Sequence, residues 1–188
     1  MLTFTFDNFD EVKRRFEPRV VQRAVNTTVT RTATRAKTEV SRQIRAIYNI
    51  KAGTVNEVVR RRIERRSEET VAVLEYRGNP LPIDRFGTTT RTVRSRGGRR
   101  VAVSARVRKD RGRQIVRGAF PLRGRGQGGP TMERAGDGRL PIRRVFRLSV
   151  PQMLNEETGI VTRVQDFIES TANRELDRNL RFFAERAR

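Results

Sequence analysis

Residues 18–48 read PRVVQRAVNTTVTRTATRAKTEVSRQIRAIY, and this stretch decides the fold expected for the chain. Apolar or small side chains recur in it at steps of three and four, at Val21, Val25, Val29, Ala33, Ala36, Val40, Ile44 and Ile47. This spacing places one apolar stripe along one face of a long helix. The threonine-rich part, residues 27–38, lowers helix propensity, so the helix must depend on packing against another element.

A second stripe of this kind lies near the C-terminus and predicts a helix over residues 159–186. Its members are Ile160, Val164, Phe167, Ile168, Thr171, Leu176, Leu180 and Phe183. Each long helix can bury its stripe against the other and against strands between them. We therefore expect an α+β layer fold, with two long helices packed on a small antiparallel sheet and a long basic Gly/Arg-rich hairpin or loop.

Shorter elements are predicted around the first long helix. Alternating apolar residues in 2–6 indicate a short strand, and capping boxes indicate helices over residues 8–16 and from Thr54 through Ile63. Residues 70–77 are β-rich and apolar on both faces, as in a strand covered by a helix.

The centre of the chain predicts a hairpin followed by two short strands. Residues 88–93 and 100–107 alternate by two, and Arg96-Gly97-Gly98-Arg99 supplies the turn between them. Strands in residues 114–120 and 131–134 are then joined by the Gly/Arg loop of residues 123–130. Pro151 predicts a break before the last helix.

Most of the positive charge lies in one segment. Residues 80–147 hold 19 Lys and Arg but four Asp and Glu, which gives +15 of the net charge of +21. Residues 108–144 contain eight of the 14 glycines and six Leu, Ile, Val or Phe in 37 positions, less than the roughly 20% typical of segments that fold on their own. We expect the basic ribbon, residues 94–147, to be ordered by a partner rather than by its own core.

The length of 188 residues favours a single domain over residues 1–188. Within this domain, the basic β-ribbon forms an excursion over residues 88–147. The first ten residues carry acids where a signal peptide needs basic residues, and no run of 18 apolar residues follows. We therefore expect assembly in the cytoplasm and no membrane association.

The composition removes most catalytic chemistry. The chain has no Cys and no His, which excludes thiolate or imidazole metal sites and nucleophile–imidazole pairs. Residues 124–129 match a dinucleotide-binding pattern, but no buried strand precedes them and Pro130 follows where the helix should begin. The acid pairs at residues 68–69 and 156–157 do not converge on a cation site. We predict no enzyme activity, no catalytic residue, no cofactor and no metal.

A net charge of +21 implies an anionic partner. Arginines make up 38 of the 42 basic residues, which suits bidentate contacts with phosphate or carboxylate, although a codon bias toward arginine explains the same number. The candidate DNA- or partner-facing residues are Arg94, Arg96, Arg99, Arg100, Arg106, Arg108, Arg111, Arg113, Arg117, Arg123 and Arg125. Aromatic residues beside them are few, Phe86 and Phe120, which favours sequence-blind contact with double-stranded DNA. An acidic protein surface remains the open alternative.

Several short motifs, in this order, carry a family resemblance. They are Leu81-Pro-Ile-Asp-Arg-Phe-Gly87, a basic hairpin, Gly118-Ala-Phe120, Met132-Glu-Arg134, Arg139-Leu-Pro-Ile142 and Ser149-Val-Pro151 before a final helix. The chain resembles, over nearly its whole length, the minor tail protein Z family of lambda-like tailed phages and prophages, which are tail-completion or neck proteins.

The resemblance implies a structural virion protein that completes the head-proximal end of a phage tail. It implies a homo-oligomeric ring, with six copies, at the head–tail junction and its DNA channel. The implied partners are the tail terminator, the tape-measure end and the head–tail connector proteins, and the implied location is the tail or neck of the virion. A free, sequence-nonspecific nucleic-acid-binding protein with an Arg/Gly-rich loop is the alternative function.

Overall fold

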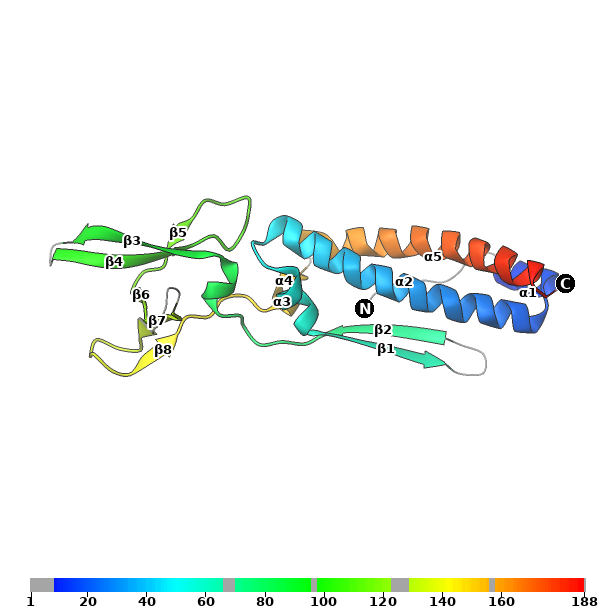
Figure 1. The fold of residues 1–188 in the computed structure, drawn as a ribbon, viewed down its shortest axis with the longest axis horizontal. Coiled ribbons are helices and arrows are strands. Elements are labelled where there is room, and N and C mark those ends of the chain that lie inside the picture. Colours follow the sequence, from blue (N-terminus) through cyan, green and yellow to red (C-terminus); the bar gives the residue numbers. More distant parts are fainter. Residues whose placement is uncertain (1–8, 66–69, 96–97, 123–128, 156–157, 188) are drawn as a thin grey trace. The chain divides into compact units, whose positions relative to one another are not determined.

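The computed structural model describes residues 9–65, 70–95, 98–122, 129–155 and 158–187. The chain forms two compact units (Figure 1). The helical unit comprises Met1–Gln43, Val59–Arg77 and Leu154–Arg188, and the β unit comprises Ile44–Val58 and Gly78–Met153. Both contain helices and antiparallel strands, so the predicted mixed helix-and-sheet class is confirmed. A single domain over residues 1–188 stays a prediction.

Two antiparallel long helices build the helical unit. They are α2 (Pro18–Ile47) and α5 (Ile160–Glu185), and both agree with the predicted bounds to within one residue. At one end Val21 and Ala24 of α2 form a buried cluster with Leu176 and Leu180 of α5. The short helix α1 (Phe9–Arg15) adds Val12 to this cluster, so the apolar stripes that predict the helices also pack them together.

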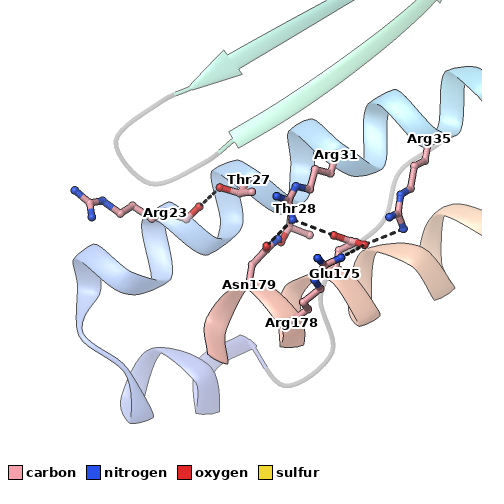
Figure 2. A network of polar contacts seen from close by, with 8 residues as sticks. All are labelled: Arg23, Thr27, Thr28, Arg31, Arg35, Glu175, Arg178 and Asn179. Carbon is pink, nitrogen blue, oxygen red and sulfur yellow. Dashed lines mark hydrogen bonds and ion pairs between the residues drawn. The ribbon is translucent and has the colours of Figure 1, made fainter. Parts of the chain in front are cut away.

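The middle of the α2–α5 contact is polar (Figure 2). Glu175, whose side chain is 3% exposed, lies 2.8 Å from a guanidinium nitrogen of Arg35 and 3.6 Å from one of Arg31. Asn179 donates to the hydroxyl of Thr28 at 2.9 Å and accepts from Arg31 at 3.1 Å. Sliding either helix by one turn, about 5.4 Å, would separate these groups. The polar contacts therefore fix the register of the two helices.

A second polar link joins the same helices farther along. The buried carboxylate of Glu39 accepts from Arg42 at 2.8 and 2.7 Å and from Gln43 at 2.6 Å. Gln43 in turn accepts a hydrogen bond from Arg163 of α5 at 2.9 Å. The hydrogen bond from Arg42 holds the pKa of Glu39 below its usual range, despite the opposing effect of burial. Glu39 therefore stays ionised at neutral pH.

A hairpin of β1 (Val59–Arg65) and β2 (Thr70–Tyr76) completes the helical unit. Arg61 donates to the hydroxyl of Thr34, and Thr70 donates to the side chain of Asn26 at 2.6 Å. These contacts place one face of the hairpin against α2. The predicted strand over residues 70–77 is thereby confirmed.

The predicted helix from Thr54 through Ile63 is wrong in its second half. The helix α3 (Ala52–Glu57) ends before Val58, and Ile63 lies in β1 opposite Ala72. The capping box is a local signal, whereas the backbone partners of β1 come from a later segment. β-branched residues at 58, 59 and 63 favour the strand once that partner is in place.

The β unit contains two three-stranded antiparallel sheets. The first has the order β3-β4-β5 and the second β6-β7-β8; their strands are β3 (Thr88–Ser95), β4 (Gly98–Ala105), β5 (Gln114–Ile115), β6 (Ala119–Pro121), β7 (Thr131–Arg134) and β8 (Ile142–Arg144). The hairpin and the strand over residues 131–134 are confirmed. The single strand predicted over residues 114–120 is wrong, because the structure divides it into β5 and β6, which pair in different sheets. The single predicted sheet is instead divided into three small ones, counting β1–β2, within the described residues.

A buried cluster holds the β unit together, formed by Ile83, Val103, Ala105, Val116, Ala119 and Val145. Ile83 lies in the short 3₁₀ helix η1 (Ile83–Phe86), and the other five lie in the basic ribbon. The expectation that this ribbon lacks its own core is therefore wrong for its described residues. The count of large apolar residues in 108–144 missed this core because most of its members are alanines or lie just outside that range.

Residues 81–87, part of the motif that carries the resemblance, tie the β unit together through their backbone. Leu81 exchanges backbone hydrogen bonds with the chain at Arg147 and Leu148, and Ile83 donates to Val145 at 3.0 Å. Gly87 follows η1 with φ +66°, and a side chain there would lie 2.8 Å from the amide nitrogen of Asn49. These residues of the motif therefore fix the path of the backbone rather than supply reactive side chains.

The helix α4 (Val150–Met153) contains Pro151 in its first turn, so the predicted break at Pro151 is wrong. The backbone amide of Ser149 donates to the side chain of Gln152 at 2.8 Å, and the amide of Gln152 donates to the hydroxyl of Ser149 at 3.4 Å. This reciprocal capping starts the helix. Proline is tolerated there because a first-turn N–H has no helical acceptor.

Some predicted features lie outside the described residues. These are the strand over residues 2–6, Arg96 and Gly97 of the hairpin turn, and residues 123–128 of the Gly/Arg loop. The predicted helix over residues 8–16 is confirmed as α1. Within the part of the chain that is described, no helix is long and apolar enough to cross a membrane.

Removing the arginines that face Glu175 should destabilise the protein more than removing Glu175 itself. In R31Q/R35Q the buried carboxylate keeps Arg178 at 4.0 Å as its nearest remaining cation, and we expect a loss of about 3–5 kcal/mol in the free energy of unfolding. In Glu175→Gln the two arginines, 49% and 42% exposed, can turn to water, and the expected loss is about 1 kcal/mol. Urea unfolding followed by circular dichroism measures both values.

The triple variant R31Q/R35Q/E175Q is the control. It no longer buries an unpaired charge, so it should recover most of the stability that R31Q/R35Q loses. A triple variant as unstable as R31Q/R35Q would contradict the role given to this ion-pair network.

Candidate partner-facing basic surface

The two units differ sharply in charge. The β unit holds 21 Lys and Arg against five Asp and Glu, a net charge of +16, which leaves +5 of the total +21 for the helical unit. The predicted concentration of charge in one part of the chain therefore coincides with one compact unit. The helical unit has 16 acids to balance its 21 basic residues.

Four of the five acids in the β unit lie against arginines. The pairs are Asp84–Arg144 at 3.2 Å, Asp110–Arg108 at 2.8 Å, Glu133–Arg143 at 2.7 Å and Glu57–Arg85 at 3.9 Å. Asp137, the fifth, has no ion pair among the described residues. These five acids balance five of the 21 positive charges of the β unit, and the other 16 have no acid within this unit to balance them.

Arg108 serves the fold rather than a partner. Its guanidinium donates to both carboxylate oxygens of Asp110, at 3.0 and 2.8 Å, and lies 5.8 Å from the ring centre of the buried Tyr48. The hydrogen bond from Arg108 holds the pKa of Asp110 below its usual range. Asp110 is therefore ionised and occupies Arg108 at neutral pH.

Arg106 and Arg113 are also held within the β unit. Arg113 donates to the backbone oxygen of Gly87 at 2.8 Å and to the hydroxyl of Thr89 at 3.1 Å, which ties the segment before β5 to the start of β3. Arg106 donates to the backbone oxygen of Lys109. Both side chains are exposed, and one guanidinium nitrogen of each is held by a contact within the β unit.

Three arginines of the predicted set make no such contact within the described residues. Arg94, Arg111 and Arg117 are exposed, and no hydrogen bond or ion pair with another described residue holds their side chains. Arg91 of β3 has the same properties and was not among the predicted residues, although it lies in the alternating strand over residues 88–93. We call Arg91, Arg94, Arg111 and Arg117 the uncommitted arginines.

The remaining predicted arginines are placed as follows. Arg99 and Arg100 lie in β4, with their backbones opposite Arg94 and Val93. Arg96, Arg123 and Arg125 lie outside the described residues. The structure therefore gives side-chain contacts within the fold for three of the eleven predicted arginines, finds none for three others, and leaves the side chains of the remaining five undescribed.

Aromatic side chains do not accompany the uncommitted arginines. Phe86 is fully buried. The ring of Phe120 contacts the guanidinium of Arg134, which lies 5.8 Å from the ring centre. Over the described ranges, no group of three or more acids could hold a metal ion. The acid pairs at residues 68–69 and 156–157 lie outside those ranges. What the described surface offers chemically is guanidinium groups for phosphate or carboxylate oxygens.

Comparison with known proteins gives a match over nearly the whole chain. The family described as Prophage minor tail protein Z (GPZ) matches residues 3–186. No curated protein and no solved structure matches the chain. The resemblance carried by the motifs in residues 81–151 is thereby confirmed.

Arginines used by the fold and uncommitted arginines should differ in their effect on stability. Arg113→Ala removes the donor to Gly87 and Thr89 and should lower the free energy of unfolding by about 1 kcal/mol. Arg117→Ala makes the same change in charge without losing such a contact, so its effect should be below about 0.5 kcal/mol. Thermal unfolding of both variants at one ionic strength makes the comparison. Equal losses would show that net charge, rather than the Arg113 contacts, determines the effect.

Proposed function

The chain belongs to the prophage minor tail protein Z family, and we propose that it completes the head-proximal end of a phage tail. A structural role in the tail, a place in the virion and contact with other tail components follow from the family. The proposal adds the position. Six copies form a neck ring between the tail terminator and tape-measure end on one side and the head–tail connector on the other, around the channel that DNA enters.

The charge of the β unit is the observation that carries this proposal. A net +16 on one unit repels itself and every neighbouring copy. A ring of such units needs an anion at its centre. Double-stranded DNA supplies one negative charge per about 1.7 Å of its axis, so a DNA channel satisfies this requirement.

The uncommitted arginines support contact with the DNA backbone rather than with bases. They are exposed and have no stacking aromatic residue beside them, and the recognition of unstacked bases needs such residues. Phosphate contacts carry no sequence information. A channel through which a whole genome passes requires this kind of sequence-blind contact.

Replacing uncommitted arginines should weaken DNA binding in a salt-dependent way. In R94A/R111A/R117A the slope of log K against log salt should fall by about 0.9 for each lost phosphate contact, with no change in sequence preference. Binding to a short DNA duplex, measured by fluorescence anisotropy at several salt concentrations, gives the slope.

The matched control is R19A/R23A/R174A. These arginines are exposed residues of the helical unit, and their removal lowers the net charge by the same amount. An equal fall in slope for both triple variants would show a general charge effect. An unchanged slope in R94A/R111A/R117A would withdraw the DNA-facing role of these residues.

The position in the particle can be tested by imaging. An electron micrograph of particles carrying a labelled copy of this chain should show the label at the tail end next to the head. A label along the tail tube or at the distal tip would contradict the proposal. DNA binding by the chain without incorporation into particles would favour the free nucleic-acid-binding protein instead.

A further inference from the structure

The β6–β7–β8 sheet, whose strands are drawn in Figure 1, carries the buried Ala119 and Thr131 on one face. Phe120 lies opposite Met132, and Met132 lies opposite Arg144, so these three residues share a face. Ala119, the neighbour of Phe120, belongs to the buried cluster of the β unit. Because successive residues of a strand point to opposite faces, the face of Phe120 and Met132, which we call the open face, points away from that cluster.

A second apolar row lies on the same open face. Leu122 is joined to Pro130 by a backbone hydrogen bond of 2.9 Å, two residues beyond the Phe120–Met132 pair. Met132 lies opposite Arg144, so Pro130, two residues before Met132, lies opposite Phe146, two residues after Arg144. On its other side Phe146 forms a β-bridge with Pro82. Leu122 is 42% exposed and Phe146 is 50% exposed. On this face, Leu122 and Phe146 are therefore large apolar side chains that the described residues leave about half exposed, beside the half-buried Phe120 and Met132.

Arginines surround this open face. The guanidinium of Arg134 lies 5.8 Å from the ring centre of Phe120, and Arg144 ends the row of Met132. The carboxylate of Asp84 nearby is already held by Arg144 and by the backbone of Thr131, at 3.2 and 3.1 Å. The border of the apolar surface is therefore positive.

This composition is that of a protein interface. Aromatic, Met and Arg side chains are enriched at the centres of such interfaces, and contiguous exposed apolar surface is uncommon on isolated proteins. This surface also differs from the surface that carries the uncommitted arginines. Those arginines lie on β3 and on the segments around β5, where no described aromatic residue is exposed. The two surfaces fit different partners.

The charges favour one kind of occupant. A DNA duplex offers phosphates but no apolar surface to cover Leu122 and Phe146. A second copy of the chain would bring another unit of net charge +16 against this one. A different protein, with carboxylates around an apolar centre, satisfies both the apolar surface and the arginines at its border.

We propose that the open face of the β6–β7–β8 sheet docks another tail protein whose contact surface is apolar at its centre and acidic at its rim. The inference rests on the proposed function, because the proposed position places this chain against other tail proteins. It adds which surface makes that contact and with what chemistry.

Polar substitutions on the open face should reduce binding to tails. The probe is tails assembled without this chain, mixed with the purified full-length protein and sedimented. L122S/F146S should bind these tails at least about tenfold more weakly than the unchanged protein, since exposed apolar anchors carry most of an interface's binding energy. Both side chains are already about half exposed, so thermal unfolding should hardly change.

Two controls isolate the surface. Ile115→Ser alters a residue of β5 that is 54% exposed and lies in the other sheet, and it should bind tails as the unchanged protein does. Arg134→Glu should weaken tail binding by charge reversal at the border, whereas Arg117→Glu should not. DNA binding by L122S/F146S should keep the salt slope of the unchanged protein.

Each of the other outcomes contradicts a specific part of the proposal. Tail binding that survives L122S/F146S would overturn the docking surface and leave the proposed position in place. A lowered DNA salt slope in L122S/F146S would make the face a DNA contact and overturn the protein partner. Self-association that this variant abolishes would identify a second copy as the occupant. Failure of the unchanged protein to bind tails would overturn the proposed function and the docking surface together.

Discussion

Carboxylates are scarce in the β unit, with five Asp and Glu beside 21 Lys and Arg, and the fold uses them where segments distant in sequence meet. Asp84 accepts from the backbone amide and the hydroxyl of Thr131 and lies against Arg144, so one side chain joins η1 to two strands. Glu133 and Arg143 join β7 to β8 across the sheet. Because four of the five acids are already paired with arginines of the unit, most of the surplus arginines have no acid of this unit to pair with.

In the helical unit, charged and polar residues lie between two long helices and fix their register. Its threonine-rich stretch, which is unfavourable for an isolated helix, places Thr28 and Thr32 fully buried in the contact with α5. There Thr28 accepts from Asn179, beside the buried Glu175. Apolar clusters supply most of the free energy of this contact, and the polar groups between them define one register. The contact with α5 therefore uses the hydroxyl of Thr28, whereas the buried hydroxyl of Thr32 has no hydrogen-bond partner among the described residues.

The parts of the fold set by local periodicity could be predicted, and the parts set by distant partners could not. Both long helices follow from their apolar stripes, and the β3–β4 hairpin follows from alternation around a glycine turn. The strand containing Ile63 depends on residues 70–76, which no local signal links to it. For the basic surface, the density of arginines is visible in the sequence. The pairing of Arg108 with Asp110 joins residues only two positions apart, so it is a local contact. The hydrogen bond from Arg113 to the backbone oxygen of Gly87 joins residues 26 positions apart, and only the structure reveals it.

The uncommitted arginines and the open face of the β6–β7–β8 sheet belong to one unit but respond differently to their surroundings. Contact between arginine and phosphate weakens steeply as salt rises, because the counterions released from DNA gain less free energy when they enter a more concentrated salt solution. Contact through Leu122 and Phe146 depends on removing apolar surface from water, which salt weakens little. A tail protein with both surfaces can hold its protein neighbours firmly while its contact with DNA stays adjustable. That combination suits the proposed place at a DNA channel, because DNA would pass the proposed ring while the ring itself stays in place.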